Sequence, residues 1–241
     1  MVEFRRPLHI RIAQILARMD AAFLEQSGCY FGGGTQISLG YGEFRESGDI
    51  DFIVSSREGI RAIRETVSSN SLGKLFKAPI LLAREVLTDR DAVRTFLIEE
   101  KTAKPVKFEI VYEGRIDVAG AADAAFPVPT LTPSCAVAEK LLANADRGLD
   151  RSTFSRDAID LAHLALALDE ETFAQGYATA VGAYGASILG QLNAVLKRLE
   201  LDAAYRSDCI AALAIEDPKR LRQGLTRLRA LRKALVASER R

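Results

Sequence analysis

The sequence predicts an α+β protein in which a mixed sheet with helices is followed by an all-helical C-terminal domain. Extended apolar runs occur before residue 117, whereas apolar residues at helical spacing dominate after Pro133. Between the two patterns, the segment FPVPTLTP contains three prolines and predicts a rigid connector. We therefore expect an α/β domain over residues 1–130 and a helical domain over residues 131–241.

The N-terminal part begins with an expected helix and continues with alternating strands and helices. Pro7 suits a first helical turn and Gly28 a stop, so the apolar positions between them predict one helix. The expected helices cover residues 7–26, 35–39 and 57–69, and the expected strands cover residues 29–31 and 50–54. Three further extended runs follow, PILLAREVL, AVRTFLIEE and PVKFEIVYEG.

After the connector, every strong pattern is helical. Six segments carry it, at residues 134–147, 154–168, 170–181, 188–199, 203–215 and 218–238. We therefore expect no strand in this half of the chain.

Composition narrows the class of protein without naming an activity. The chain of 241 residues is 48% hydrophobic and 27% charged, which is ordinary for a globular protein with a buried core. Lys and Arg number 33 against 32 Asp and Glu, so no overall charge indicates nucleic acid or membrane, and any such argument must be local. The three cysteines are widely spaced without a CxxC pair, and no signal peptide or membrane span is evident. We expect a cytoplasmic protein that has no membrane partner.

Two aspartates stand at one strand of the N-terminal part. Residues two apart in a strand point the same way, so Asp49 and Asp51 share a face while Ile50 and Phe52 can point into the core. Carboxylates held this close repel one another unless a cation lies between them, and hard oxygen ligands suit Mg²⁺. The alternative is a solvated strand end with two exposed aspartates.

A glycine turn precedes these aspartates. Gly33, Gly34 and Thr35 follow an apolar strand and open an expected helix, so their backbone N–H groups could hold a phosphate. The alternative is a plain tight turn, but the aspartates downstream favour a site for a phosphate and a metal. The pattern is neither a P-loop nor GxGxxG.

Metal-assisted nucleotidyl transfer usually needs a third carboxylate. Glu109 is the expected third metal ligand and base, because it lies in the strand VKFEIV, where Lys107 shares its face. Glu113 is a weaker candidate, and an exposed edge-strand charge is the alternative for Glu109.

These motifs together resemble the DNA polymerase β-like nucleotidyltransferase superfamily. The matching positions are Phe31, Gly33, Gly34, Thr35, Arg45, Ser47, Asp49, Ile50 and Asp51. Departures from the superfamily pattern are Glu109 in place of the more usual aspartate and a spacer before Asp49 about one residue longer than is common. The resemblance implies a nucleotidyltransferase-like sheet and places Arg45 and Ser47 among the nucleotide-binding residues.

The helical half is similar to the AbiEii/AbiGii toxin-type nucleotidyltransferases. The matching positions are Lys140, Asn144, Arg147, Arg156, Asp157, Asp160 and Leu161. The resemblance implies an Mg²⁺-dependent toxin that transfers NMP from an NTP, with a tRNA 3′ end as acceptor and a cognate antitoxin as partner. It also implies an essential Lys140 and a catalytic Asp157.

The helical positions support nucleotide binding on physical grounds as well. Lys140, Asn144 and Arg147 share one helix face, with donors that suit phosphate and ribose or base. The alternative is an internal ion pair with Asp157 or Asp160, two carboxylates one helical turn apart.

The last expected helix, residues 218–238, is rich in lysine and arginine. A leucine stripe predicts packing, and the basic remainder is either a solvated face or a phosphate-binding patch for RNA.

Two other functions of the protein stay open: a small-molecule nucleotidyltransferase of the antibiotic-modifying type, and a nucleotide-binding protein without turnover.

Overall fold

The computed structural model describes residues 3–98 and 104–238, which form two compact units. The sheet unit comprises Met1–Gly40 and Ser47–Thr132, and the helical unit comprises Tyr41–Glu46 and Pro133–Arg241. Six residues from the N-terminal half therefore belong to the helical unit, which the sequence analysis does not anticipate. No helix of the described ranges is long and apolar enough to cross a membrane.

The sheet unit combines short helices with a mixed sheet. Its helices are α1 (Pro7–Ala17), α2 (Ala21–Gln26), α3 (Gly33–Gly40) and α4 (Arg57–Thr66), with a 3₁₀ turn at Gly73–Leu75. Its strands are β1 (Cys29–Gly32), β2 (Ile50–Val54), β3 (Leu81–Leu82), β4 (Leu87–Thr88), β5 (Ala92–Ile98), β6 (Val106–Tyr112), β7 (Gly120–Ala121) and β8 (Thr130–Leu131).

The strands lie in the order β3-β5-β6-β2-β1-β8-β7, with β4 paired to β5. The pair β2–β6 is parallel, whereas β1–β2 and β5–β6 are antiparallel, so the sheet is mixed as expected. The run AVRTFLIEE forms β5, except that Glu99 and Glu100 lie outside the described residues.

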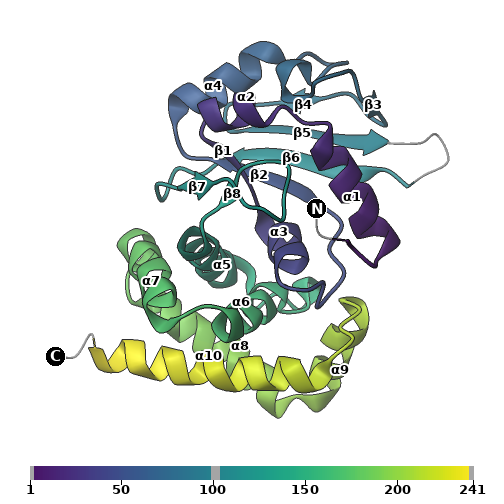
Figure 1. The fold of residues 1–241 in the computed structure, drawn as a ribbon. Helices are drawn as coiled ribbons and strands as arrows, with labels where there is room; N and C mark the ends of the chain where they lie inside the picture. The colour runs from purple at the N-terminus through teal and green to yellow at the C-terminus, as the bar shows by residue number, and fades with distance from the viewer. Residues whose placement is uncertain (1–2, 99–103, 239–241) are drawn as a thin grey trace. The chain divides into compact units, whose positions relative to one another are not determined.

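One face of the sheet is covered by α1, α2 and α4 (Figure 1). Phe31, Phe52 and Phe108 from three adjacent strands form the buried aromatic centre of this face. Because strand side chains alternate, burial of Phe52 and Phe108 turns the neighbouring Asp51 and Glu109 to the opposite face. The core thereby fixes which way the polar residues point.

The expected single helix over residues 7–26 is wrong, because the chain breaks between α1 and α2. Met19 leaves the helix to form a β-bridge with Phe76, and its side chain is fully buried. Asp20 then caps α2, since its carboxylate accepts a hydrogen bond of 3.0 Å from the N–H of Phe23. Tertiary pairing and a local cap therefore override a continuous apolar stripe.

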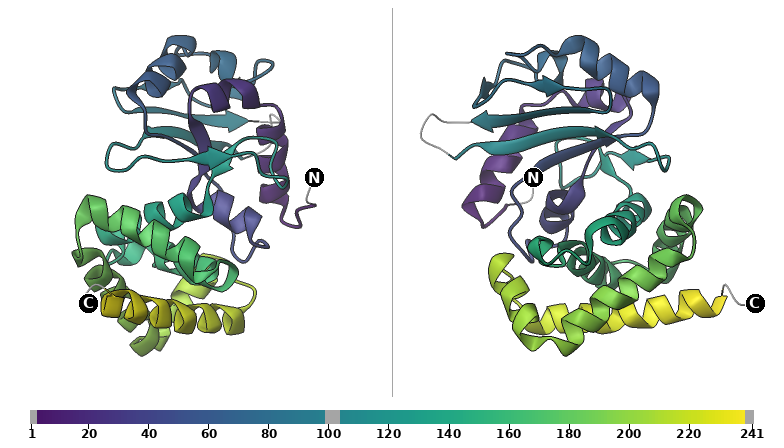
Figure 2. Two further views of the ribbon diagram at one scale, coloured as in Figure 1. Left: turned by 60° about the vertical axis from the view of Figure 1, so that its left-hand side comes forward. Right: turned by 180° about the vertical axis from the view of Figure 1, so that it is seen from behind.

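The helical unit contains six α-helices in its described residues. They are α5 (Pro133–Arg147), α6 (Arg156–Ala167), α7 (Glu170–Tyr184), α8 (Ser187–Leu201), α9 (Ala203–Ala212) and α10 (Pro218–Ser238), and a 3₁₀ turn at Arg151–Thr153 precedes α6. Figure 2 shows α10, in yellow, as one long helix, which packs on α6 and α8. Gly224 permits the close approach to α6, because a Cβ there would lie 2.5 Å from the Ala162 carbonyl oxygen. The α+β class that the sequence predicts is confirmed.

Candidate active site

Strand register brings the predicted carboxylates of the sheet unit together. Asp51 on β2 lies opposite Gly32 of the antiparallel neighbour β1 and opposite Glu109 of the parallel neighbour β6. Asp49 lies one residue before the start of β2. Asp51 therefore has the end of β1 on one side and Glu109 on the other.

The glycine turn passes directly against Asp51. Gly33 has φ +71°, and a Cβ at this position would lie 2.6 Å from Asp51 Oδ2. Both the backbone conformation and the close approach therefore require glycine. Helix α3 begins at Gly33, so the backbone N–H groups of its first turn, which have no partner within the helix, start beside a carboxylate that can hold a metal.

Thr35 and Ser47 are tied to one another. The Thr35 hydroxyl donates to Ser47 Oγ at 2.9 Å, and the Ser47 N–H donates to His9 Nε2 at 3.1 Å. The threonine that the sequence assigns to phosphate thus anchors the chain two residues before Asp49. Its role toward a nucleotide stays a prediction.

Glu109 is held by two cations. Its Oε2 accepts a hydrogen bond of 2.7 Å from Lys107 Nζ, and its Oε1 accepts one from Arg94 Nε. Burial acts to raise the pKa of Glu109, but the bonds from Lys107 and Arg94 outweigh it and lower that pKa below its usual value. Burial likewise acts to lower the pKa of Lys107, and the carboxylates of Glu109, Asp51 and Asp49 reverse this and raise it.

The donors in the sheet unit fit a divalent cation only in part. Asp49 and Asp51 supply hard carboxylate oxygens on a partly exposed face, as Mg²⁺ prefers. Over residues 3–98 and 104–238, however, no three His, Cys, Asp or Glu side chains are grouped so that they could hold a metal. The weaker candidate, Glu113, is buried and paired with Arg115 at 2.5 Å.

The helical unit contains a buried charge network made of Arg45, Lys140, Arg147, Asp157 and Asp160. Arg45 donates to both oxygens of Asp160, at 2.7 and 2.9 Å. Lys140 Nζ lies 2.8 Å from Asp160 and 3.0 Å from Asp157. Arg147 Nε lies 2.8 Å from the other oxygen of Asp157, and the arginine side chain is 42% exposed. The internal ion pair left open by the sequence analysis is therefore present.

Electrostatics in this network favour the charged forms. Burial alone would raise the pKa of Asp160, yet Arg45 and Lys140 lower it, and the pKa of Asp157 is lowered similarly by Lys140 and Arg147. Burial alone would lower the pKa of Lys140, and the two carboxylates raise it instead. The pairing therefore stabilises the ionised forms of Lys140, Asp157 and Asp160.

The 41–46 segment, Tyr41–Glu46, is fixed within the helical unit by further contacts. The Phe44 ring stacks on His163 with centroids 3.6 Å apart, and the Glu46 N–H donates to the Leu213 carbonyl at 2.9 Å. Asn144, in contrast, is buried and its side-chain amide has no hydrogen-bond partner among the described residues.

The sequence places Lys107 on the face of Glu109 without showing that the two side chains pair, and it indicates neither Arg94 nor the partner of Asp160. Lys107 was recognisable, because it stands two residues before Glu109 and strand alternation puts both on one face. Arg94 is identified only through the pairing of β5 with β6, which sets it opposite Glu109. Asp160 binds a residue 115 positions earlier in the chain, which no local pattern indicates.

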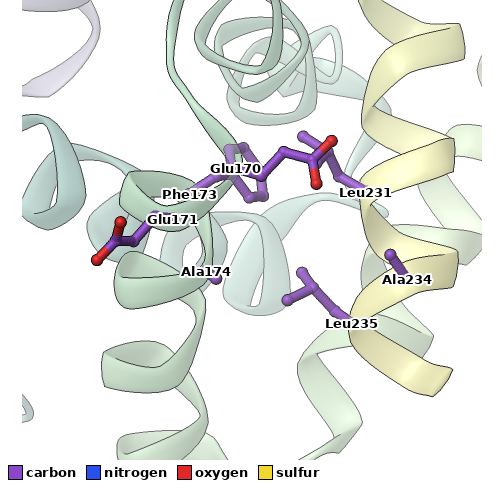
Figure 3. Close-up of a pocket in the computed structure, with 7 residues that line it drawn as sticks. All are labelled: Glu170, Glu171, Phe173, Ala174, Leu231, Ala234 and Leu235. Atoms are coloured by element: carbon purple, nitrogen blue, oxygen red, sulfur yellow. The ribbon is translucent and has the colours of Figure 1, made fainter. Parts of the chain in front are cut away.

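Two hollows of the helical unit lie at α10. A pocket of about 300 Å³ lies between α7 and α10 and is lined by Phe173, Leu231 and Leu235, among others. Figure 3 shows the Glu170 carboxylate directed toward Leu231, whereas the Glu171 carboxylate points away from α10. A second, open groove of about 640 Å³ runs along α10 and is lined mainly by polar and basic residues, including Lys219 and Arg222. Neither is lined by a residue of the predicted site.

Comparisons with known proteins bear on the family and the fold of the chain. A family model described as nucleotidyl transferase AbiEii toxin, type IV TA system, matches residues 14–234. The chain is also similar to the crystal structure of JHP933 from Helicobacter pylori, with 20% identity, TM-score 0.58, and 98% of this chain and 97% of that chain covered. A putative nucleotidyltransferase from H. pylori gives 18% identity, TM-score 0.56, and 95% and 94% coverage, so both share the fold. No curated protein matches the chain.

Proposed function

The chain belongs to the AbiEii nucleotidyl transferase toxin family of type IV toxin–antitoxin systems, and we propose that it transfers NMP from an NTP to an acceptor hydroxyl in an Mg²⁺-dependent reaction. The acceptor oxygen would form a bond to the α-phosphorus as the bond to pyrophosphate breaks. The family also implies a cognate antitoxin. We propose that both proteins act in the cytoplasm.

One observation carries the proposal: Asp51 lies between the glycine turn and Glu109, with Asp49 just before it. Asp49 and Asp51 would bind the metal, which supplies positive charge to the triphosphate. The N–H groups of Gly33 and Gly34 would donate to phosphate oxygens, with Thr35 and Ser47 keeping the turn in place. The sequence predicts Glu109 as a third metal ligand and base, but both of its oxygens already accept hydrogen bonds, one from Lys107 and one from Arg94, which argues against that role.

Within the helical unit, Arg147 is the member of the charge network best suited to reach a nucleotide. It is 42% exposed, whereas Lys140 and Asp157 are 6% and 2% exposed. We propose that Arg147 binds phosphate and that Asp157, itself paired with Lys140, holds the guanidinium in place. We also propose that Asn144 binds the nucleotide, because its buried side-chain amide has no hydrogen-bond partner among the described residues.

For the acceptor we propose a tRNA 3′ end. Lys219, Arg220, Arg222 and Lys233 are exposed on α10, and no ion pair involves them within the described part of the chain. Arg227 and Arg229, in contrast, pair with Glu170 and Glu200. A basic helix face beside an open groove suits an RNA backbone better than a small molecule.

The central test is incubation of the purified protein with total tRNA and each α-labelled NTP. Wild type should label RNA with at least one NTP, and Asp51→Asn should lose at least a hundredfold in rate. Asp117→Asn is the matched control, because Asp117 is an exposed aspartate of the same unit. Absence of labelling by wild type with all four NTPs, despite nucleotide binding, would support a protein without turnover.

A second experiment separates the two kinds of acceptor. Charge reversal at Lys219 and Arg222 should weaken tRNA labelling at least tenfold and reduce its salt dependence. Lys197→Glu, on the exposed face of α8, is the control and should have little effect. Unchanged labelling in the double variant would favour a small-molecule acceptor.

A further inference from the structure

The face of the sheet that carries the candidate metal ligands already contains two cations. Glu109 is 15% exposed, and each of its oxygens accepts a hydrogen bond from a positive group, Lys107 or Arg94. Arg94 is also bound to Asp89 at 2.6 Å, so its orientation is set from two sides. A metal ion at the Glu109 oxygens would therefore compete with two charge-assisted hydrogen bonds and meet the repulsion of two cations.

Register places Lys107 among the aspartates. Ile50 on β2 pairs with Phe108 on β6, and Asp51 pairs with Glu109. Continued by one residue, the parallel register sets Asp49 beside Lys107. The Lys107 ammonium therefore lies on the same face of the sheet as the carboxylates of Asp49, Asp51 and Glu109. Its positive charge balances negative charge that a second divalent cation would otherwise balance.

We propose that this site binds one divalent cation through Asp49 and Asp51, and that the Lys107 ammonium, positioned by Glu109, takes the place of a second metal ion. The inference rests on the proposed function for the metal itself and adds the number of ions and the role of Lys107. Glu109 is then a positioning residue, whose carboxylate orients a cation toward the substrate phosphates. Arg94 keeps the second Glu109 oxygen occupied.

The test counts Mn²⁺ ions by electron paramagnetic resonance, first on the protein alone and then with a non-hydrolysable α,β-methylene NTP. Wild type should hold one tightly bound Mn²⁺ in either state. Asp51→Asn should lose it, and Glu109→Gln should keep it with less than a threefold change in affinity. Lys107→Met should gain a second ion that the Lys107→Met/Glu109→Gln double variant lacks.

Two controls guard against general effects of charge and folding. Lys77→Met removes an exposed lysine from the same unit and should leave one ion. Lys107→Arg keeps the positive charge and should also leave one, and melting curves establish that each variant is folded. Two ions in wild type, one of them lost in Glu109→Gln, would overturn this inference alone. A wild type that binds no Mn²⁺ through Asp49 and Asp51 would refute the proposed function together with it.

Discussion

Asp160→Asn should destabilise the helical unit strongly. Asp160 is completely buried, accepts two hydrogen bonds from Arg45 and contacts the Lys140 ammonium at 2.8 Å. The substitution removes the negative charge that accepts both of these Arg45 hydrogen bonds, and the Arg45 side chain is only 3% exposed. Lys140 keeps Asp157 as a partner, so the loss falls mainly on the Arg45–Asp160 pair.

Removal of one partner from a buried ion pair costs about 3–5 kcal/mol. At about 2–4 °C per kcal/mol for a chain of this size, the melting temperature should fall by on the order of 10 °C. Urea unfolding followed by far-UV circular dichroism measures the free energy of unfolding directly. Asp208→Asn, at an exposed aspartate of α9, should change it by less than about 0.5 kcal/mol.

The Arg45→Met/Asp160→Leu double variant tests the mechanism of this loss. It removes both charges, so it should recover much of the stability that Asp160→Asn loses, because no cation remains buried without its carboxylate. A loss below about 1 kcal/mol in Asp160→Asn, or a double variant worse than the sum of the two single variants, would refute the argument.

Three further predictions concern pH and the glycine turn. The pKa of Asp160 in the folded state lies below its usual 3.8, so its ionised carboxylate contributes stability above pH 3.8, and this contribution is lost as the pH falls through the folded pKa. In an acid titration, the free energy of unfolding of Asp160→Asn should therefore depend less steeply on pH than that of wild type. Burial lowers the pKa of His163 below 6.5, so the stability of the folded protein should also fall as the pH drops from 7 toward 5. His163→Gln should abolish this pH-dependent loss when the melting temperature is measured across the same range. Gly33→Ala should cost about 1–3 kcal/mol and weaken Mn²⁺ binding at least tenfold in a titration, because the new Cβ meets Asp51 Oδ2 at a left-handed backbone position. Gly190→Ala, in open space on α8, should leave Mn²⁺ binding unchanged, and the opposite pattern would exclude the steric explanation.

The part of the site that the sequence predicts is the part encoded locally. Gly33 and Asp51 are recognisable from spacing and strand alternation, and the apolar residues between the polar ones set the direction of each side chain. The six expected helices of the C-terminal half follow from periodicity in the same way.

The remainder depends on pairings between distant parts of the chain. The family resemblance assigns Arg45 to nucleotide binding, and only the fold shows that its guanidinium binds Asp160 of α6. The two cations on Glu109 likewise follow from which strands are neighbours. The break at Met19 arises from a bridge to Phe76, 57 residues later, which no helical pattern contains.

The placement of the 41–46 segment also determines how the protein can be divided. The polypeptide passes between the two units three times, after Gly40, after Glu46 and after Thr132. A fragment ending at Thr132 would carry Phe44 and Arg45 without the helix that receives them, so we expect it to aggregate when expressed alone. Co-expression of fragments 1–132 and 133–241 should instead allow reassembly, with the 41–46 segment as the element through which one fragment completes the other.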